Sequence, residues 1–181
     1  MNSIELNTNN RYATFSELDY LRTLASALPA TIRVVMIGAG PGVMALAIKE
    51  GNPDCALTVI DKDTCEWTQK HLESAGLLRN VVFVNRYSAD VGREWTDHIN
   101  LLIIDGDHSY AGVKADLEAW LPHIAPGGYV FMHDYDAGGT EFADQERYPG
   151  VEQALTNCMP YTFNTAAFVG TAVVIQSHPI P

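Results

Sequence analysis

The feature that most constrains the fold is a short apolar run that ends directly in a glycine-rich turn. Residues 33–37 have the β-branched composition of a strand, and glycines follow at positions 38, 40 and 42. A helical segment then extends from Val43 to Glu50 and is closed by Gly51. A strand that turns through glycine into a helix is typical of parallel α/β sheets. The glycines also let the backbone approach a ligand closely, although a tight structural turn is the simpler interpretation.

The alternation of strand and helix patterns continues along the chain and predicts the fold class. The run 101–104 is wholly apolar, as expected of a central parallel strand that is buried on both faces. We therefore predict an α/β fold with a doubly wound, mostly parallel, seven-stranded Rossmann-like sheet and an antiparallel C-terminal strand. The other expected strands are 56–60, 81–84 and 129–132, and an antiparallel closing pair is expected at the β-branched segment 169–176; the other expected helices are 16–28 with Ser16 as N-cap, 64–75, 111–121 and 151–157.

Length and composition favour one soluble domain. The 181 residues, 47% of them hydrophobic, predict a single domain over 1–181 in which residues 1–30 form a helical lead-in. No stretch approaches the roughly 20 apolar residues of a membrane span, and no basic segment precedes an apolar run at the N-terminus. The net charge of −11 opposes contact with phosphate backbones, so we expect no nucleic-acid partner.

The three cysteines, at positions 55, 65 and 158, are odd in number and lack the close spacing of zinc ligands. They predict neither a disulfide framework nor a zinc site. A reducing, cytoplasmic location fits best.

Asp61 is a candidate nucleoside ligand. It stands at the end of the second predicted strand, 23 residues after Gly38, where a carboxylate can accept hydrogen bonds from both hydroxyls of a ribose. A helix cap or a solvated charge is the alternative, although Asp63 can serve the capping role. The dinucleotide fingerprint requires a glycine where this chain has Val43, which makes an NAD-dependent oxidoreductase the weaker interpretation.

The most distinctive part of the sequence is Ile-Ile-Asp-Gly-Asp-His-Ser-Tyr at 103–110. It continues through Val-Lys-Ala-Asp-Leu at 113–117, Pro-Gly-Gly at 126–128 and His-Asp-Tyr at 133–135. With the glycine loop, these residues resemble the class I S-adenosylmethionine-dependent methyltransferases, particularly the small-molecule O-methyltransferases of the macrocin and cephalosporin-cluster type. The similarity extends over about residues 33–176.

The resemblance implies S-adenosylmethionine as cofactor and a small-molecule hydroxyl as methyl acceptor. A module that binds S-adenosylmethionine without turnover is a further alternative. Because the chain offers no separate domain for substrate recognition, a homodimer is one way to complete the acceptor pocket. The expected cofactor contacts are Gly38, Ala39, Gly40 and Gly42 beneath the methionine part, Asp61 at the ribose, Tyr87, Ser88 and Ala89 at the adenine, and Asp105 beside the cofactor.

Carboxylates and histidines follow the fourth and fifth predicted strands, whose carboxyl ends meet at one edge of the sheet. Asp105, His133 and Asp134 can share one divalent cation there, and oxygen-rich ligation suits Mg²⁺ or Mn²⁺. We expect His108 to act as general base beside a catalytic Asp105. The alternatives are a cofactor contact or turn cap for Asp105 and ordinary structural roles for both histidines. The polar loop 136–148 is expected to act as a lid, or to be a plain surface loop.

Overall fold

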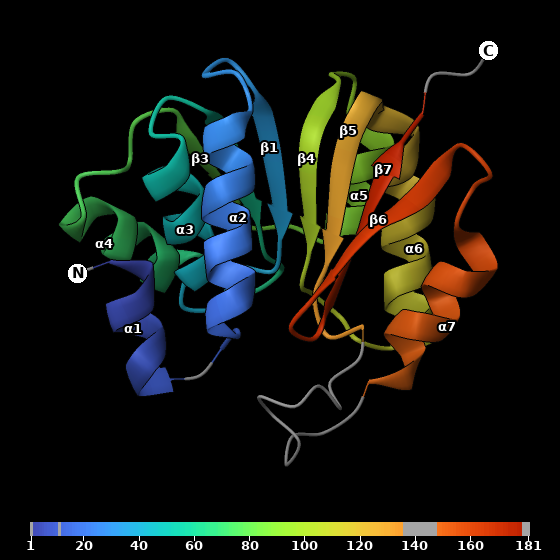
Figure 1. Ribbon diagram of the computed structural model, residues 1–181, viewed down its shortest axis with the longest axis horizontal. Coiled ribbons are helices and arrows are strands. Elements are labelled where there is room, and N and C mark those ends of the chain that lie inside the picture. The colour runs from blue at the N-terminus through green and yellow to red at the C-terminus, as the bar shows by residue number, and fades with distance from the viewer. Residues whose placement is uncertain (1, 11, 136–147, 179–181) are drawn as a thin grey trace.

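The computed structural model describes residues 2–10, 12–135 and 148–178, and a mixed sheet forms its centre (Figure 1). Seven strands follow the order β3-β2-β1-β4-β5-β7-β6, and β7 runs antiparallel to both of its neighbours. The predicted fold class is confirmed. The strands are β1 (Arg33–Ile37), β2 (Ala56–Ile60), β3 (Val81–Val84), β4 (Ile99–Ile104), β5 (Ile124–Met132), β6 (Phe163–Val169) and β7 (Ala172–Ser177).

Helices cover both faces of the sheet, as in a doubly wound fold (Figure 1). The first four pack on one face and the last three on the other. Across the described ranges, none of the helices has the length and apolar character that crossing a membrane requires. The helices are α1 (Ser3–Asn10), α2 (Phe15–Ala27), α3 (Val43–Gly51), α4 (Glu66–Ser74), α5 (Ser88–Glu94), α6 (Tyr110–Trp120) and α7 (Pro149–Cys158), with a 3₁₀ turn at Leu121–His123.

Two hydrophobic cores result from the alternation of side chains along each strand. In β1, Val34 and Met36 face the core beneath α1 to α4, whereas Val35 and Ile37 face the core beneath α5 to α7. Because both faces of the central strands are covered, these strands appear in the sequence as unbroken apolar runs. The same packing fixes the carboxyl ends of β1, β2, β4 and β5 along one edge of the sheet.

One local prediction was wrong at the residue level. The N-cap of α2 is Thr14, not Ser16, because Thr14 and Glu17 form a reciprocal capping box: the Thr14 hydroxyl accepts from the Glu17 N–H and the Glu17 carboxylate accepts from the Thr14 N–H. The β-branched segment 169–176 contains the end of β6 and most of β7, which form the antiparallel pair expected there. Gly170, with φ of +59°, turns the chain between the end of β6 and the start of β7.

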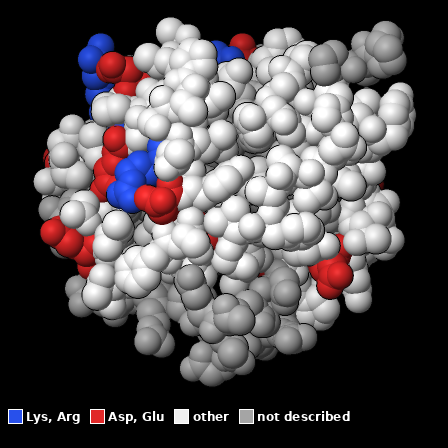
Figure 2. Space-filling view, viewed as in Figure 1, with Lys and Arg blue, Asp and Glu red and all other residues white. Residues whose placement is uncertain are grey.

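The surface bears its charges in mixed groups. Figure 2 shows that they gather mainly on the side of the molecule that carries α2, α3 and α4, and that Lys and Arg side chains in this view lie beside Asp or Glu. Ion pairs of described surface residues include Arg22 with Asp19 and Arg79 with Asp54. The loop 136–148, expected as a lid, lies outside the described residues except for Tyr148.

Candidate functional site

The three glycines after β1 differ in what a side chain at each position would contact. A Cβ at Gly38 would lie 1.9 Å from the backbone oxygen of Asp105, and a Cβ at Gly42 would lie 2.9 Å from Cα of Thr68. These two glycines are therefore required by close packing within the protein. Gly40, with φ of +45°, has nothing within 4 Å of its Cβ position. The space that Gly40 leaves is open to a ligand.

Two side chains of helix α4 contact the backbone of this glycine loop. The Thr68 hydroxyl donates to the backbone oxygen of Ala39 at 2.9 Å, and Nδ1 of His71 lies 2.7 Å from the backbone oxygen of Pro41. Both contacts hold carbonyls of the loop at fixed positions. The loop is thus shaped before any ligand binds.

Asp61 also shapes the loop. Its Oδ2 accepts a hydrogen bond from the Ala39 N–H at 2.9 Å, and its Oδ1 accepts one from the Asp63 N–H at 2.9 Å. The carboxylate lies at the carboxyl end of β2, where the sequence placed it, and it is partly exposed. It can hold the loop and still face a bound nucleoside, because each carboxylate oxygen has more than one acceptor direction.

Two cavities occupy the carboxyl edge of the sheet. The larger has a volume of about 590 Å³, within the usual range for small-molecule sites. The smaller, of about 230 Å³, lies over the glycine loop. Every predicted cofactor contact lines one of the two, and Asp105 and His108 line both. The larger cavity takes in Gly38, Asp61, Tyr87, Ser88, Ala89 and Asp105; the smaller takes in Ala39, Gly40, Gly42, Asp105, His133 and Asp134.

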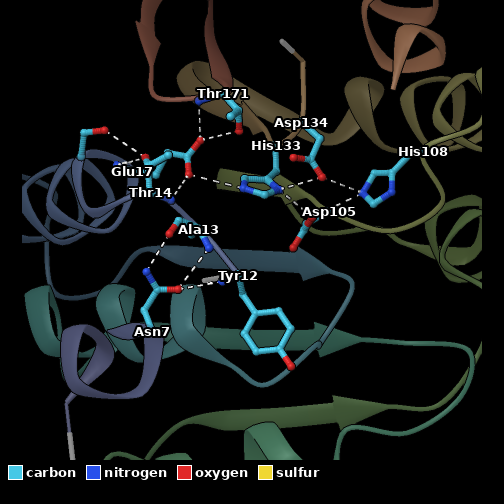
Figure 3. Close-up of polar contacts among 11 residues, drawn as sticks. Asn7, Tyr12, Ala13, Thr14, Glu17, Asp105, His108, His133, Asp134 and Thr171 are labelled. Atoms are coloured by element: carbon cyan, nitrogen blue, oxygen red, sulfur yellow. Dashed lines mark hydrogen bonds and ion pairs between the residues drawn. The ribbon is translucent and has the colours of Figure 1, made fainter. Parts of the chain in front are cut away.

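Asp105, His108 and Asp134 converge where the cavities meet (Figure 3). One ligand atom from each lies within 4.8 Å of the others. Nε2 of His108 lies 3.2 Å from Oδ2 of Asp134 and 3.6 Å from Oδ1 of Asp105, and this buried nitrogen has no hydrogen-bond partner of good geometry among the described residues. Contact with Asp105 raises the pKa of His108 against the opposing effect of burial.

His133 joins the same carboxylates from the other side (Figure 3). Its Nδ1 lies 3.0 Å from Oδ1 of Asp105 and 3.2 Å from Oδ2 of Asp134, while its Nε2 faces Oε2 of Glu17 at 3.4 Å. Burial opposes protonation, but the carboxylates outweigh it and raise the pKa of His133 well above its usual value. An imidazolium has no lone pair for a metal. Both histidines therefore face the two carboxylates, and the protonated form of His133 would balance their charge.

Sequence reasoning missed Glu17, which connects the site to two distant segments. This fully buried residue accepts hydrogen bonds from the Thr14 N–H at 2.6 Å and from the N–H and hydroxyl of Thr171, each at 2.8 Å. Burial raises the pKa of Glu17, but His133, Thr14 and Thr171 outweigh it, so the pKa is lowered. The Thr-x-x-Glu capping signature was visible in the sequence. The contact with His133 required the fold.

The N-terminal lead-in also contributes a side chain to the site. Oδ1 of Asn7 accepts from the N–H groups of Tyr12 and Ala13 at 2.9 and 3.1 Å, which fixes the turn between α1 and α2. Tyr12 lines the smaller cavity, opposite the carboxylates (Figure 3). Nothing in the local sequence around Tyr12 marked it as a site residue.

Comparison with known families decides the class of the protein. Residues 35–135, more than half of the chain, match the family described as a methyltransferase domain. The chain belongs to this family. The matched range contains the glycine loop, Asp61 and the convergent cluster of Asp105, His108 and Asp134.

Solved structures share the fold of this methyltransferase domain along nearly its whole length. The Bacillus cereus O-methyltransferase in complex with SAH has a TM-score of 0.77 and 12% identity, and the match covers 98% of this chain and 89% of that one. A Corynebacterium glutamicum protein has a TM-score of 0.76, 18% identity and coverage of 99% and 88%. TomG from Streptomyces achromogenes, involved in tomaymycin synthesis and solved with SAM, has a TM-score of 0.74, 14% identity and coverage of 98% and 88%.

A curated relative matches only a short part of the methyltransferase domain. The uncharacterized protein y4gI of Sinorhizobium fredii is 47% identical over 36 residues, which are 20% of this chain and 4% of that protein.

Proposed function

We propose that this methyltransferase domain transfers the methyl group of S-adenosylmethionine to a hydroxyl oxygen of a small molecule. One observation carries the proposal. At the carboxyl edge of the sheet, within the residues that match the methyltransferase family, a cavity large enough for a nucleoside adjoins the cluster of Asp105, His108 and Asp134. Ligands of open α/β sheets bind at this edge. The shared fold with O-methyltransferases solved with SAH or SAM supports the same assignment.

The residues present fit the cofactor. The larger cavity has room for the adenosine, with Asp61 at the ribose and Tyr87, Ser88 and Ala89 along the base. The open space at Gly40 fits the methionine part, because no protein atom lies within 4 Å of its Cβ position and the residue lines the smaller cavity.

The residues also fit a divalent ion. Two carboxylates, Asp105 and Asp134, and one imidazole offer ligand atoms within 4.8 Å of one another, and this hard, oxygen-rich set suits Mg²⁺ or Mn²⁺. Asp134 is held in the left-handed region with φ of +56°, which turns its carboxylate toward the cluster. His133 supports these carboxylates as a neighbouring cation.

S-adenosylmethionine supplies an electrophilic methyl group, and a bound divalent ion supplies the charge that lowers the pKa of a nearby hydroxyl. The chain itself orients the reactants: the glycine loop and Asp61 hold the nucleoside, and Tyr12 bounds the space for the acceptor. Nε2 of His108, buried at the junction of the cavities, is placed to accept the acceptor's proton. One lone pair cannot bind an ion and accept a proton at the same time. We therefore assign ion binding to the carboxylates of Asp105 and Asp134, and proton acceptance to His108.

The remaining parts of the proposal concern partners and location. A small-molecule acceptor fits the cavities, and the net charge of −11 disfavours nucleic acid. A homodimer that completes the acceptor pocket and a cytoplasmic location belong to the same proposal. A reducing compartment would keep the thiols of Cys55, Cys65 and Cys158 reduced.

Methyl transfer from labelled S-adenosylmethionine to a panel of sugars and phenols, with Mg²⁺ or with chelator, tests the proposal. We expect labelled product and S-adenosylhomocysteine in equal amounts, loss of turnover in Asp134→Ala, and no change in Asp97→Ala, whose side chain is 61% exposed and remote from the cavities. Hydride transfer with NAD instead of methyl transfer would replace the proposal with the oxidoreductase alternative. Full activity in the presence of chelator would show that the reaction needs no divalent ion, and would leave His108 as a metal-independent base.

A further inference from the structure

Asp116 is a buried carboxylate in the wall of the larger cavity, and the proposed reaction does not use it. The residue is 3% exposed and lies on α6, at the end of the cavity that also contains Ser88 and Gly106. It does not line the smaller cavity, where Asp134 and Tyr12 lie. A carboxylate is seldom buried unless something pairs with it, because removal from water disfavours the charged form.

The structure gives Asp116 one partner and leaves its second oxygen available. Oδ1 is in hydrogen-bond contact with the Ser88 hydroxyl, and among the described residues Oδ2 has no such contact. The neighbouring residue Gly106 has no side chain of its own, and its Cβ position lies 3.9 Å from Oδ2; Gly106 and Asp116 line the larger cavity together. Burial raises the pKa of Asp116 to about 6, Ser88 opposes the rise and the charge of Asp107 adds to it. At neutral pH the group is thus ionised, and Oδ2 can accept a hydrogen bond from a ligand in the larger cavity.

We propose that Asp116 reads the base of the bound nucleoside by accepting, at Oδ2, a hydrogen bond from the exocyclic amino group of adenine. The Ser88 hydroxyl contacts Oδ1, which leaves Oδ2 for the base. The inference rests on the proposed function, since it concerns the nucleoside of the same cofactor. It makes Asp116 a specificity-determining residue: a base with an oxygen at position 6, as in hypoxanthine, would bring an acceptor against a carboxylate.

Binding of two probes to the unmodified protein gives the first test. S-adenosylhomocysteine carries adenine, and S-inosylhomocysteine differs from it by the 6-oxo group and the adjoining N1–H. Titration calorimetry should show binding of the inosine analogue weaker by about 10- to 100-fold, the range expected when a hydrogen bond to a charged group is lost. This measurement needs no variant and cannot be confounded by misfolding.

Variants assign the discrimination to Asp116. In Asp116→Asn the amide keeps the contact with Ser88 and can turn either a donor or an acceptor toward the base, so the affinity ratio should fall to within about threefold. Ser88→Ala should weaken both probes and keep the discrimination, because the carboxylate remains. Glu118→Gln is the matched control: it lies on the same helix, its side chain is 61% exposed and it contacts Lys114.

Each outcome decides the inference. A large ratio in the wild type and in Ser88→Ala, lost only in Asp116→Asn, supports it. An equal affinity of the wild type for both probes overturns it while leaving the proposed function intact. An unchanged ratio in Asp116→Asn, or a ratio lost equally in Ser88→Ala, would assign base reading to another group or to the loop as a whole. Failure of the wild type to bind either probe overturns the inference together with the proposed function.

Discussion

Asp116→Asn is expected to stabilise the protein at neutral pH, because the folded state keeps a carboxylate away from water. Burial raises the pKa of Asp116 from 3.8 to about 6. One pKa unit corresponds to about 1.36 kcal/mol, so ionised Asp116 opposes folding by about 3 kcal/mol. Because the pKa of Asp116 is higher in the folded state, protonated Asp116 favours folding at pH values below its unfolded-state pKa of about 4. This contribution to the free energy of unfolding disappears as the pH rises through about 6, the pKa in the folded state.

The pH dependence isolates this effect from any fixed difference between aspartate and asparagine. Linkage gives an opposing free energy of about 1.6 kcal/mol at pH 5 and about 3 kcal/mol at pH 8. The free energy of unfolding of Asp116→Asn minus that of the wild type should therefore increase by about 1.4 kcal/mol over this range. Urea denaturation at several pH values, with Glu118→Gln as control, measures the difference. A difference that is constant with pH would refute the reasoning, since it would mean that Asp116 titrates alike in both states.

Three further substitutions test the site. Gly40→Ala should abolish S-adenosylhomocysteine binding while near-ultraviolet circular dichroism still reports the native fold, because the added methyl meets no protein atom; normal binding would remove the loop from the cofactor site. Asp61→Ala should weaken that binding by about 1.5 to 3 kcal/mol in calorimetry, and an unchanged affinity would place the ribose elsewhere. Glu17→Gln should lower the free energy of unfolding by about 3 to 5 kcal/mol, because His133 loses a buried partner; a change under about 1 kcal/mol in urea denaturation would deny the pair its structural role.

The parallel half of the sheet could be predicted from the sequence because its strands are buried on both faces. Runs such as 101–104 are wholly apolar, and the glycines after β1 mark where the chain must turn. Burial on both faces gives these strands the apolar runs by which the sequence predicts them, and packing in one parallel sheet aligns their carboxyl ends. The approach of Asp61 and Asp105 to a common cavity follows from that alignment.

The antiparallel edge and the second layer of the site could not be predicted in the same way. The strand β6 is exposed along much of its length and so lacks a continuous apolar signal, and α5 has only seven residues. Glu17 and Asp116 are charged residues on helices, where solvent exposure is the usual outcome. Their burial depends on neighbours far along the chain, Thr171 for Glu17 and Ser88 for Asp116.

Titration calorimetry with S-adenosylhomocysteine and with NAD⁺, each with and without Mg²⁺, tests the central claim most directly. We predict saturable binding of S-adenosylhomocysteine at one site, and loss of that binding in Gly40→Ala. Mg²⁺ should change the affinity by less than about threefold, because the ion acts on the acceptor oxygen. NAD⁺ should produce no heat of binding. Binding of NAD⁺ in competition with S-adenosylhomocysteine, or binding of neither nucleotide, would contradict the assignment of this methyltransferase domain to S-adenosylmethionine chemistry.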